Sequence, residues 1–303
     1  MELIKCFKAL SDNTRLRLLQ VLQQYELNVN EIVLVVDMIQ SGVSRHLKIL
    51  LDSGLLTSRR DGSFTYYFAA KNDTTISLIR LLEKNLDHKE ITSRDLEKSR
   101  EMIKIRQNRT KRFFKYIAPQ WDRLKKEVFG NFDLNSMIKG KVIFKGKIAD
   151  LGCGTGELID QFSKEIINNF IGIDSSPEML EQARLRLSGT NNAELRLGEL
   201  EHLPMKNKEI DTAIMNMVLH HISQPQLPIA EAYRVLKPKG FFILSDFQKH
   251  DQKNINEIMG GSWYGFEKEK IMAWLADAGF HVRAMDSYPV NHGLKINVFT
   301  AQK

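Results

Sequence analysis

Cysteine is scarce in this chain: only Cys6 and Cys153 occur among 303 residues, far apart in the sequence. Two distant cysteines are too few for a disulfide framework or a cysteine-rich metal site. Long apolar runs are also missing, because no stretch approaches the roughly 18 residues of a membrane-spanning helix. The first residues, which include Glu2 and Lys5, lack the pattern of a secretory signal. We therefore expect a cytoplasmic protein without a membrane span or a bound metal.

The composition is that of a globular protein, with 43% hydrophobic and 27% charged residues. At 303 residues the chain is too long for one typical core, which predicts two domains and a connector. The net charge of +7 is concentrated in residues 89–127, which hold 13 Lys and Arg against 6 Asp and Glu. A basic segment can contact phosphates, but a solvated helix laced with ion pairs explains it more simply. Charge alone does not establish nucleic-acid binding.

The most informative motif is Asp-Leu-Gly-Cys-Gly-Thr-Gly at residues 150–156, which is answered one strand later by Asp174. Its alternate glycines let the backbone approach a ligand, and an acid after the next strand can bind ribose hydroxyls. The spacing fits S-adenosylmethionine better than NAD, whose Gly-x-Gly-x-x-Gly loop serves a pyrophosphate. Asp150 would hold the ammonium group of S-adenosylmethionine. Taken alone, the glycines would also suit a plain strand-to-helix turn.

A helix-turn-helix is predicted in the N-terminal third. A helix-start signal at Ser11 or Asp12 precedes leucines at helical spacing. Residues 31–37 form the next apolar element, residues 38–42 interrupt it around a glycine, and a helical pattern resumes at residues 43–51. The apolar face of this second helix leaves outward the side-chain types that reach base edges and phosphates. These DNA-contact candidates are Gln40, Ser41, Ser44, Arg45 and Lys48, with His46 as a packing or phosphate-facing residue.

A β-hairpin is predicted next. Two alternating apolar runs within residues 54–68 are separated by Asp61-Gly62, the strongest short hairpin signal. Arg59 and Arg60 lie near the tip and complete the list of DNA-contact candidates. Such a two-stranded ribbon beside a helix-turn-helix is a wing.

Residues 8–19, 40–48 and 59–67 together resemble the arsenic-repressor (ArsR) family of winged-helix regulators. The resemblance implies a homodimer whose outer helices pair the subunits and whose recognition helices enter successive major grooves of operator DNA. Members that sense soft metals place a Cys-x-Cys pair where this chain has residues 33–36, Val-Leu-Val-Val. Metal sensing is therefore disfavoured.

Residues 75–112 contain no Pro or Gly and predict a dimer helix followed by a spacer. An aromatic stripe follows, with Phe113, Phe114 and Trp121 expected to pack on the domain below. One of these rings, together with Tyr116, is a candidate apolar lid over the cofactor.

Beyond residue 145, strand patterns at residues 148–151, 170–173, 193–197, 210–215 and 241–245 alternate with helical ones, which predicts a doubly wound α/β sheet. Closing strands at 281–288 and 295–301, with an antiparallel last strand, resemble the seven-stranded class I methyltransferase fold. We thus predict a winged helix-turn-helix domain at 1–87, a helical connector at 88–127 and a methyltransferase domain at 128–303.

The methyltransferase resemblance implies roles at the strand ends. Asp174 would accept the ribose hydroxyls and could also cap a helix, Glu199 would contact the adenine amino group, and Leu200 would cover the base. The cofactor-binding candidates are Asp150, Gly152, Cys153, Gly154, Gly156, Asp174, Ser175, Met179, Glu199, Leu200 and Asn216.

Methyl transfer requires positioning of the acceptor and, when it is protonated, a base. The candidates are His221, His220 and Asp246, each of which could instead be structural. Methylation of exocyclic base amines is disfavoured because an Asn/Asp-Pro-Pro-aromatic motif is missing after Met215, and arsenite methylation requires more cysteines. An acceptor with a hydroxyl, amine or activated carbon remains, and residues 263–266 could line an aromatic pocket or pack in the core.

Three functions follow. The chain is predicted to be an ArsR-type regulator with a methyltransferase domain that methylates a small molecule. Alternatively, S-adenosylmethionine or S-adenosylhomocysteine acts as an effector of operator binding, without turnover. In a third case the winged helix only dimerises a metabolic methyltransferase.

Overall fold

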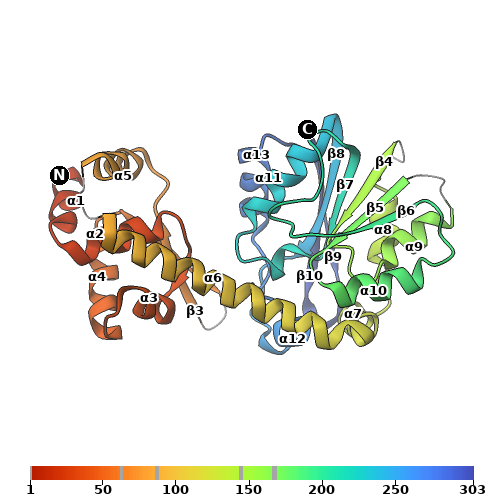
Figure 1. Cartoon of the computed structure of the whole chain (residues 1–303), viewed down its shortest axis with the longest axis horizontal. Coiled ribbons are helices and arrows are strands. Elements are labelled where there is room, and N and C mark those ends of the chain that lie inside the picture. The colour runs from red at the N-terminus through yellow and green to blue at the C-terminus, as the bar shows by residue number, and fades with distance from the viewer. Residues whose placement is uncertain (1, 62–63, 86–88, 143–145, 166–168) are drawn as a thin grey trace. The chain divides into compact units, whose positions relative to one another are not determined.

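The computed structural model describes residues 2–61, 64–85, 89–142, 146–165 and 169–303 (Figure 1). The chain divides into two compact units, Met1–Arg106 and Gln107–Lys303. The division falls inside one long helix, α6 (Lys89–Ile117). The boundaries at residues 87 and 127 that the sequence suggests stay predictions.

The N-terminal unit is a small helical fold with a β-ribbon. Its elements are α1 (Glu2–Leu10), α2 (Asn13–Leu22), β1 (Leu27–Asn28), α3 (Val29–Val36), α4 (Gln40–Asp52), β2 (Leu56–Asp61), β3 (Phe64–Ala69) and α5 (Asp73–Asn85). Helix α2 begins where the sequence indicates, because the Asp12 carboxylate accepts a hydrogen bond from the Arg15 backbone N–H at 3.0 Å. Strands β2 and β3 pair antiparallel, as the hairpin signal predicts, and Gly62 lies outside the described residues.

The start of the second helix of the helix-turn-helix was predicted three residues too late. Helix α4 begins at Gln40, so Gly42 belongs to its first turn. The left-handed residue that separates α3 from α4 is instead Asp37, with φ 54°. Asp tolerates this conformation better than most residues, so the chain needs no glycine there. The predicted packing face of α4 is confirmed, since Val43, Leu47 and Leu50 are buried.

The single helical segment predicted over residues 75–112 is two helices, α5 and α6, with residues 86–88 outside the description. The first part of α6 packs into the N-terminal unit. Asp95 accepts two hydrogen bonds from Arg17, at 2.7 and 2.8 Å, and Ile103 is buried in the same hydrophobic cluster as α2 and α3.

The C-terminal unit is built on a seven-stranded sheet. Its strands are β4 (Lys147–Leu151), β5 (Asn169–Asp174), β6 (Ala193–Leu197), β7 (Ile210–Asn216), β8 (Leu236–Phe247), β9 (His281–Pro289) and β10 (Lys295–Gln302). Their order is β6-β5-β4-β7-β8-β10-β9, and β10 runs antiparallel to both of its neighbours. The strand order reverses between β4 and β7, which is where ligands bind in open α/β sheets.

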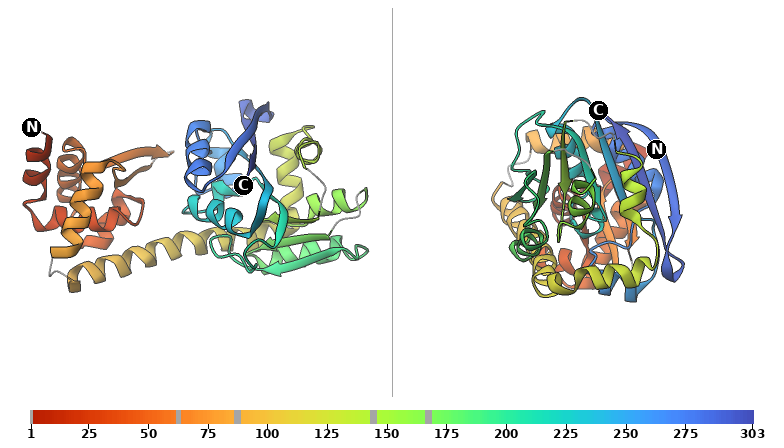
Figure 2. Two further views of the ribbon diagram at one scale, coloured as in Figure 1. Left: turned by 90° about the horizontal axis from the view of Figure 1, so that it is seen from above. Right: turned by 90° about the vertical axis from the view of Figure 1, so that its right-hand side faces the viewer.

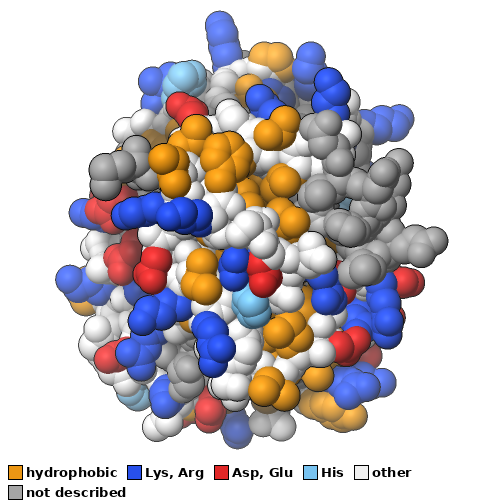
Figure 3. All heavy atoms as spheres, turned by 90° about the vertical axis from the view of Figure 1, so that its left-hand side faces the viewer, with side chains coloured by type: hydrophobic (Ala, Val, Ile, Leu, Met, Phe, Trp, Pro, Cys, Tyr) orange, Lys and Arg blue, Asp and Glu red, His pale blue; other side chains and the backbone are white. Residues whose placement is uncertain are grey.

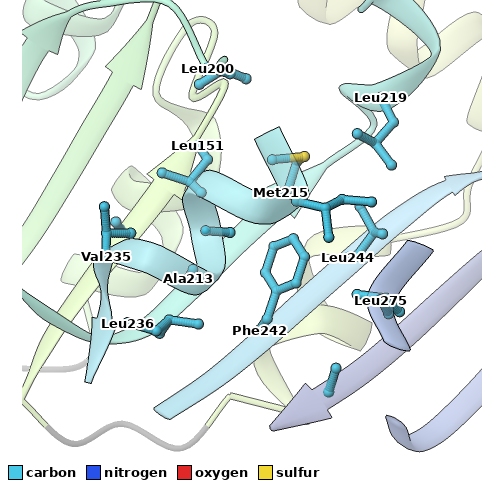
Figure 4. Close-up of a cluster of buried hydrophobic side chains, with 14 of the residues drawn as sticks. Leu151, Leu200, Ala213, Met215, Leu219, Val235, Leu236, Phe242, Leu244 and Leu275 are labelled. Atoms are coloured by element: carbon cyan, nitrogen blue, oxygen red, sulfur yellow. The ribbon is translucent and has the colours of Figure 1, made fainter. Parts of the chain in front are cut away.

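Both faces of this sheet are covered by helices (Figure 2). Helices α11 (Gln226–Val235) and α13 (Lys268–Asp277) bury one face against apolar side chains that include Leu151, Ala213, Met215 and Phe242 (Figure 4). The other face is covered by α7 (Trp121–Phe129), α8 (Leu134–Lys139), α9 (Glu157–Ser163), α10 (Pro177–Arg186) and α12 (Lys253–Met259). Alternate residues of β4 serve the two faces, so Asp150 points to the side of α9, opposite to Leu151.

Among the described residues, no helix is both long enough and apolar enough to cross a membrane.

Candidate functional site

A cavity of about 540 Å³ opens where strands β4, β5, β6 and β7 end. Its size is that of a small-molecule site. Ten of the predicted cofactor-binding residues line this cavity. They are Asp150, Gly152, Cys153, Gly154, Asp174, Ser175, Met179, Glu199, Leu200 and Asn216. Their roles in binding S-adenosylmethionine stay predictions, but the fold brings them to one place.

The glycine loop wraps closely around the end of β4. Gly152 and Gly154 have φ values of 85° and 52°, in the left-handed region. A Cβ atom on Gly152 would lie 2.5 Å from Val218 Cγ2, so a side chain cannot fit there. At Gly154 the nearest atom to such a Cβ, Trp121 Nε1, is 3.8 Å away, which leaves the backbone open to the cavity. The loop is anchored because Gly152 N–H donates to Ile173 O at 2.8 Å.

Gly156, the third glycine of the motif, is not among the described lining residues. A Cβ atom there would meet Ala183 Cβ at 3.1 Å and Leu187 Cδ1 at 3.2 Å. Its φ is 74°, at the position preceding helix α9. Gly156 is therefore required by the turn before α9 and by the close approach of α10. The structure does not place it on the cavity wall, so its contact with the cofactor stays a prediction.

Asp150 is a buried carboxyl group with an unused oxygen. It is 3% exposed, and its Oδ1 atom has no hydrogen-bond partner among the described residues. Burial, with the nearby charge of Asp174, raises the pKa of Asp150 to about 7. A cation beside the unpartnered oxygen would favour the charged form of this carboxyl group, and the ammonium group of S-adenosylmethionine is such a cation.

Asp174 holds the loops on either side of it, while Ser176 is the N-cap of α10 and the ribose contact of Asp174 stays a prediction. The Oδ2 atom of Asp174 accepts from Gly154 N–H at 2.9 Å, and its Oδ1 accepts from Ser176 N–H at 2.9 Å. The carboxylate thus shapes the glycine loop and the start of α10 while it faces the cavity. Burial raises its pKa even though these backbone hydrogen bonds favour the charged form.

Of the three catalytic candidates, the structure brings only His221 to the described cavity wall. His221 lies in the short 3-10 helix Leu219–His221 after β7. Its Nδ1 lies 3.3 Å from the carbonyl oxygen of Gly260. Because a carbonyl can only accept, Nδ1 carries the hydrogen and Nε2 carries the lone pair. Nε2 has no partner in the described chain, and burial, with the neighbouring His220, lowers the pKa of His221 well below its usual value. The ring is therefore neutral, and its role as a base stays a prediction.

His220 and Asp246 lie behind this ring and are not among the described lining residues. Asp246 Oδ1 lies 2.9 Å from His220 Nδ1, and Asp246 Oδ2 accepts from the His220 backbone N–H at 3.2 Å. The backbone of His220 in turn accepts from Ser262 and Trp263. This geometry gives the pair a supporting position away from the cavity wall, and the catalytic role expected of these two residues stays a prediction.

The aromatic wall of the cavity differs from the one suggested by sequence. Trp263 and Phe266 are 4% and 2% exposed in the core under α13, where Trp263 Nε1 donates to Ile222 O. Tyr116 is 76% exposed, so the lid that included it is wrong. The aromatic side chains lining the cavity are Phe114, Trp121, Phe129 and Phe132. Phe114 and Trp121 belong to the predicted stripe, whereas Phe129 and Phe132 flank a Gly-Asn turn with no local pattern to identify them.

Polar contacts hold α7 against the glycine loop. Thr155 Oγ1 donates to Asp122 Oδ1 at 2.8 Å, and Arg186 binds both the Asp122 carboxylate and Thr155. Although burial works to raise the pKa of Asp122, the hydrogen bonds from Arg186 and Thr155 keep it below its usual value. Lys125 also pairs with Glu157. These contacts of Asp122, Thr155 and Arg186, here called the polar latch, keep Trp121 beside Gly154.

In the N-terminal unit, the outer face of α4 presents most of the predicted DNA contacts. Gln40, Ser41, Ser44, Arg45 and Lys48 are exposed. His46 is half-buried, with Nδ1 3.7 Å from Asp12 Oδ1, so it faces its own fold. On the wing, Arg60 is exposed while Arg59 pairs with Glu26 at 2.8 Å and lies over the Tyr66 ring.

Comparison with known proteins agrees with this division. Residues 12–58 match the family model of the bacterial regulatory protein, arsR family, and residues 149–244 match a model of the methyltransferase domain. The chain is 30% identical over 143 residues to the arsenite methyltransferase of Halobacterium salinarum, covering 44% of this chain and 37% of that protein. It is 28% identical over 160 residues to the demethylmenaquinone methyltransferase of Lactiplantibacillus plantarum, covering 50% and 67%.

These similarities are partial. The chain spans 29%, 37% and 58% of the length of the first three curated relatives that it matches. Among solved structures, the [4+2]-cyclase SpnF is similar with a TM-score of 0.54 at 16% identity, over 63% of this chain and 94% of that one. A chain of the complex between the Haloferax volcanii Trm112 methyltransferase activator and its methyltransferase has a TM-score of 0.51 at 18% identity, over 61% and 96%.

Identities this low show the fold alone, and a fold does not fix a reaction. The sheet order, the antiparallel β10 and the glycine loop after β4 agree with the class I methyltransferase fold, and the matched domain implies that S-adenosylmethionine binds. The chain thus joins a helix-turn-helix of the ArsR family of bacterial regulatory proteins to a class I methyltransferase domain.

Proposed function

We propose that this protein is a DNA-binding regulator that also transfers a methyl group from S-adenosylmethionine to a small molecule. The observation that carries the enzymatic part is the shared cavity. Asp150, Asp174 and His221 all line it, and Nε2 of His221 is buried without a hydrogen-bond partner among the described residues. A site built for sensing alone would not need a base beside the donor.

The residues present suit the cofactor. Asp150 would bind the ammonium group, Asp174 the ribose hydroxyls, and Glu199 and Leu200 the adenine ring. When bound, S-adenosylmethionine supplies an activated methyl group to a nucleophile held in line with it. His221 would orient that nucleophile and accept its proton. Arsenite is a poor acceptor for this site, because Cys153 is the one cysteine of the C-terminal unit and burial raises its pKa well above that of a free thiol.

One experiment separates the proposed enzyme from the sensor. The purified full chain is incubated with methyl-labelled S-adenosylmethionine and a small-molecule extract, and binding of the cofactor is measured in parallel by calorimetry. We expect label in an extract compound and micromolar cofactor binding. Cofactor binding without any transfer would contradict the enzyme, and a ligand-dependent change in DNA affinity would then favour S-adenosylmethionine or S-adenosylhomocysteine as effector.

The same proposal includes a homodimer on operator DNA. Leu3, Ile4 and Phe7 of α1 are 50%, 60% and 52% exposed, and Ile76 and Leu81 of α5 are also exposed. Apolar side chains gather on the face of the N-terminal unit in Figure 3. Such a patch on outer helices suits pairing with a second copy. The dimer remains part of the proposal.

Replacing Arg45 or Lys48 with alanine is expected to weaken specific DNA binding by roughly 5- to 150-fold, because a base contact contributes about 1–3 kcal/mol. Duplexes selected from random sequence would be titrated by fluorescence anisotropy, which also reports two chains per duplex for a dimer. Lys71→Ala, an exposed charge outside α4 and the wing, is the control. Unchanged affinity in both α4 variants would instead support a winged helix that only dimerises the enzyme.

A further inference from the structure

Beside the predicted cofactor residues, another part of the cavity wall is formed by aromatic side chains. They are Phe114, Trp121, Phe129 and Phe132. They come from the end of α6, from α7 and from the turn that follows α7. Phe114, Phe129 and Phe132 are half-buried, so parts of these rings remain accessible within a cavity. Accessible ring surface inside a concave site is surface that a ligand can cover.

His221 is held among these rings. Its ring centroid lies 4.8 Å from that of Phe114 and 6.1 Å from that of Trp121, both edge-to-face. The Phe114 and Trp121 centroids are themselves 5.3 Å apart. Packing of this kind fixes the imidazole plane, and the hydrogen bond to Gly260 O fixes its tautomer. The aromatic wall and the His221 ring therefore belong to one subsite.

We propose that this subsite binds a planar aromatic molecule carrying a hydroxyl group, and that this hydroxyl is the methyl acceptor. The inference rests on the proposed methyltransferase function and names its substrate class. Planar rings gain from edge-to-face and offset contacts with Phe and Trp that saturated molecules of equal size do not make.

The base selects the hydroxyl. Burial leaves His221 with a low pKa, so it is a weak base. A weak base assists an aromatic hydroxyl, whose pKa is about 10 as in Tyr, far better than an aliphatic alcohol, which is several units less acidic. A neutral hydroxyl also enters an aromatic recess at lower desolvation cost than an ammonium group.

Charge on the cavity wall restricts the acceptor further. The lining carboxylates are Asp122, Asp133, Asp150, Glu157, Asp174, Glu199 and Glu201, against Lys125 and Lys126. Asp122 is paired with Arg186 and Glu157 with Lys125, but the remaining carboxylates still outnumber Lys126. Their excess disfavours acceptors that carry phosphate or several carboxylates. A neutral aromatic hydroxyl meets no such repulsion.

The transfer balances without any further reactant. The acceptor oxygen forms a bond to the methyl carbon as the carbon–sulfur bond of the donor breaks. The electron pair of that bond stays on sulfur, which becomes a neutral thioether. The hydroxyl proton passes to Nε2 of His221 and then to solvent.

The test uses 2-naphthol, its saturated counterpart decahydro-2-naphthol, and 2-naphthyl phosphate as probes of the full chain. Binding is measured by calorimetry with S-adenosylhomocysteine present, and methylation is measured by mass spectrometry with S-adenosylmethionine. We expect 2-naphthol to bind at least about 10-fold more tightly than the saturated alcohol, and to be the one probe converted to its methyl ether. Equal binding or equal conversion of the saturated alcohol would overturn the proposal.

Variants connect the preference to the wall. Phe114→Leu and Phe132→Leu should each weaken 2-naphthol binding by about 2- to 12-fold. Phe132→Tyr keeps the ring and should retain wild-type affinity, as should Tyr116→Leu, which removes an exposed ring from the same region. Wild-type affinity in both leucine variants would count against the wall as the acceptor site.

Failure of the proposed function is distinguishable from failure of this inference. A protein that does not bind S-adenosylmethionine, or that binds it and transfers label to nothing, refutes the methyltransferase itself. A protein that methylates aliphatic or phosphorylated extract compounds but not 2-naphthol keeps the function and refutes the aromatic acceptor.

Discussion

His221→Ala is expected to lower kcat for methyl transfer by about 100- to 10,000-fold, the usual contribution of a positioned general base. The affinity for S-adenosylmethionine should stay within about twofold, because Asp150 and Asp174, not His221, lie beside the expected ammonium and ribose positions. Steady-state kinetics with a labelled acceptor and calorimetry with the cofactor give the two quantities separately.

The expected loss of kcat follows from the way in which the protein fixes the His221 imidazole. Gly260 O accepts from Nδ1, so Nε2 is the basic nitrogen without any change of tautomer. Because burial keeps the pKa of His221 well below its usual value, the base is unprotonated throughout the neutral range. The rate should therefore not fall as the pH decreases from 8 to 7 on account of this group.

Restoring the rate of the His221→Ala variant with added imidazole distinguishes a catalytic role of His221 from a purely structural one. Alanine leaves a gap the size of an imidazole between Phe114 and Trp121, so added imidazole should restore part of the lost rate. His202→Ala, an exposed histidine outside the cavity lining, is the control and should keep wild-type kcat. A His221→Ala protein with unchanged kcat, or one whose lost rate follows lost thermal stability alone, would refute the catalytic assignment.

The sheet and its ligand edge could be predicted because their patterns are local. Most strands of the C-terminal unit contain a short apolar run, although β6 and β9 do not. Asp150, Asp174 and Asn216 stand at or near the carboxyl ends of their strands. Parallel strands bring such residues together whatever the intervening helices do. Period and spacing thus predict the α/β sheet, the glycine loop and Asp174, whereas the class I fold and the roles of Glu199 and Leu200 are implied by the resemblance.

The acceptor side could not be predicted in the same way. His220 and His221 are adjacent in sequence, and only the 3-10 helix with its contact to Gly260 decides which ring faces the cavity. Phe129 and Phe132 line the cavity because the polar latch of Asp122, Thr155 and Arg186 places α7 over the glycine loop. Such long-range contacts leave no periodic signature.

The helix-turn-helix shows a different limit. The sequence predicts a turn around Gly42, yet Asp37 takes the left-handed conformation and Gly42 lies in α4. Residue type ranks the candidates for a left-handed position, and packing of α3 on α4 decides between them.

Asp150→Asn is expected to weaken S-adenosylmethionine binding at pH 7.5 by about 10- to 100-fold, since a hydrogen bond between charged groups contributes roughly 1.5–3 kcal/mol. The amide keeps the shape of the side chain but cannot balance an ammonium charge. Asp160→Asn removes a carboxylate of α9 that is not among the described lining residues, and it should leave affinity unchanged. Calorimetry on the three proteins tests the difference.

The pH dependence gives the assignment a sharper signature. With a pKa of about 7, Asp150 must lose its proton before it can pair with a cation. Affinity of the wild-type protein should therefore fall about 20-fold between pH 7.5 and pH 5.5, whereas Asp150→Asn should show almost no change. A wild-type affinity that is constant over this range would assign the ammonium group to a different partner.

As the pH rises, the ligand-free wild-type protein should become less stable while its affinity for S-adenosylmethionine increases. The folded-state pKa of Asp150 lies above its ordinary value of 3.8. The group therefore contributes no penalty below pH 3.8, and the penalty grows as the pH rises from 3.8 to about 7 and is complete above that pH. At pH 8 the ligand-free Asp150→Asn protein should unfold at a higher temperature than the wild type, and saturating S-adenosylmethionine should make that difference smaller. A lower melting temperature for the ligand-free variant would mean that Asp150 stabilises the fold, and its buried, unpartnered oxygen would then have to be explained without a cationic ligand.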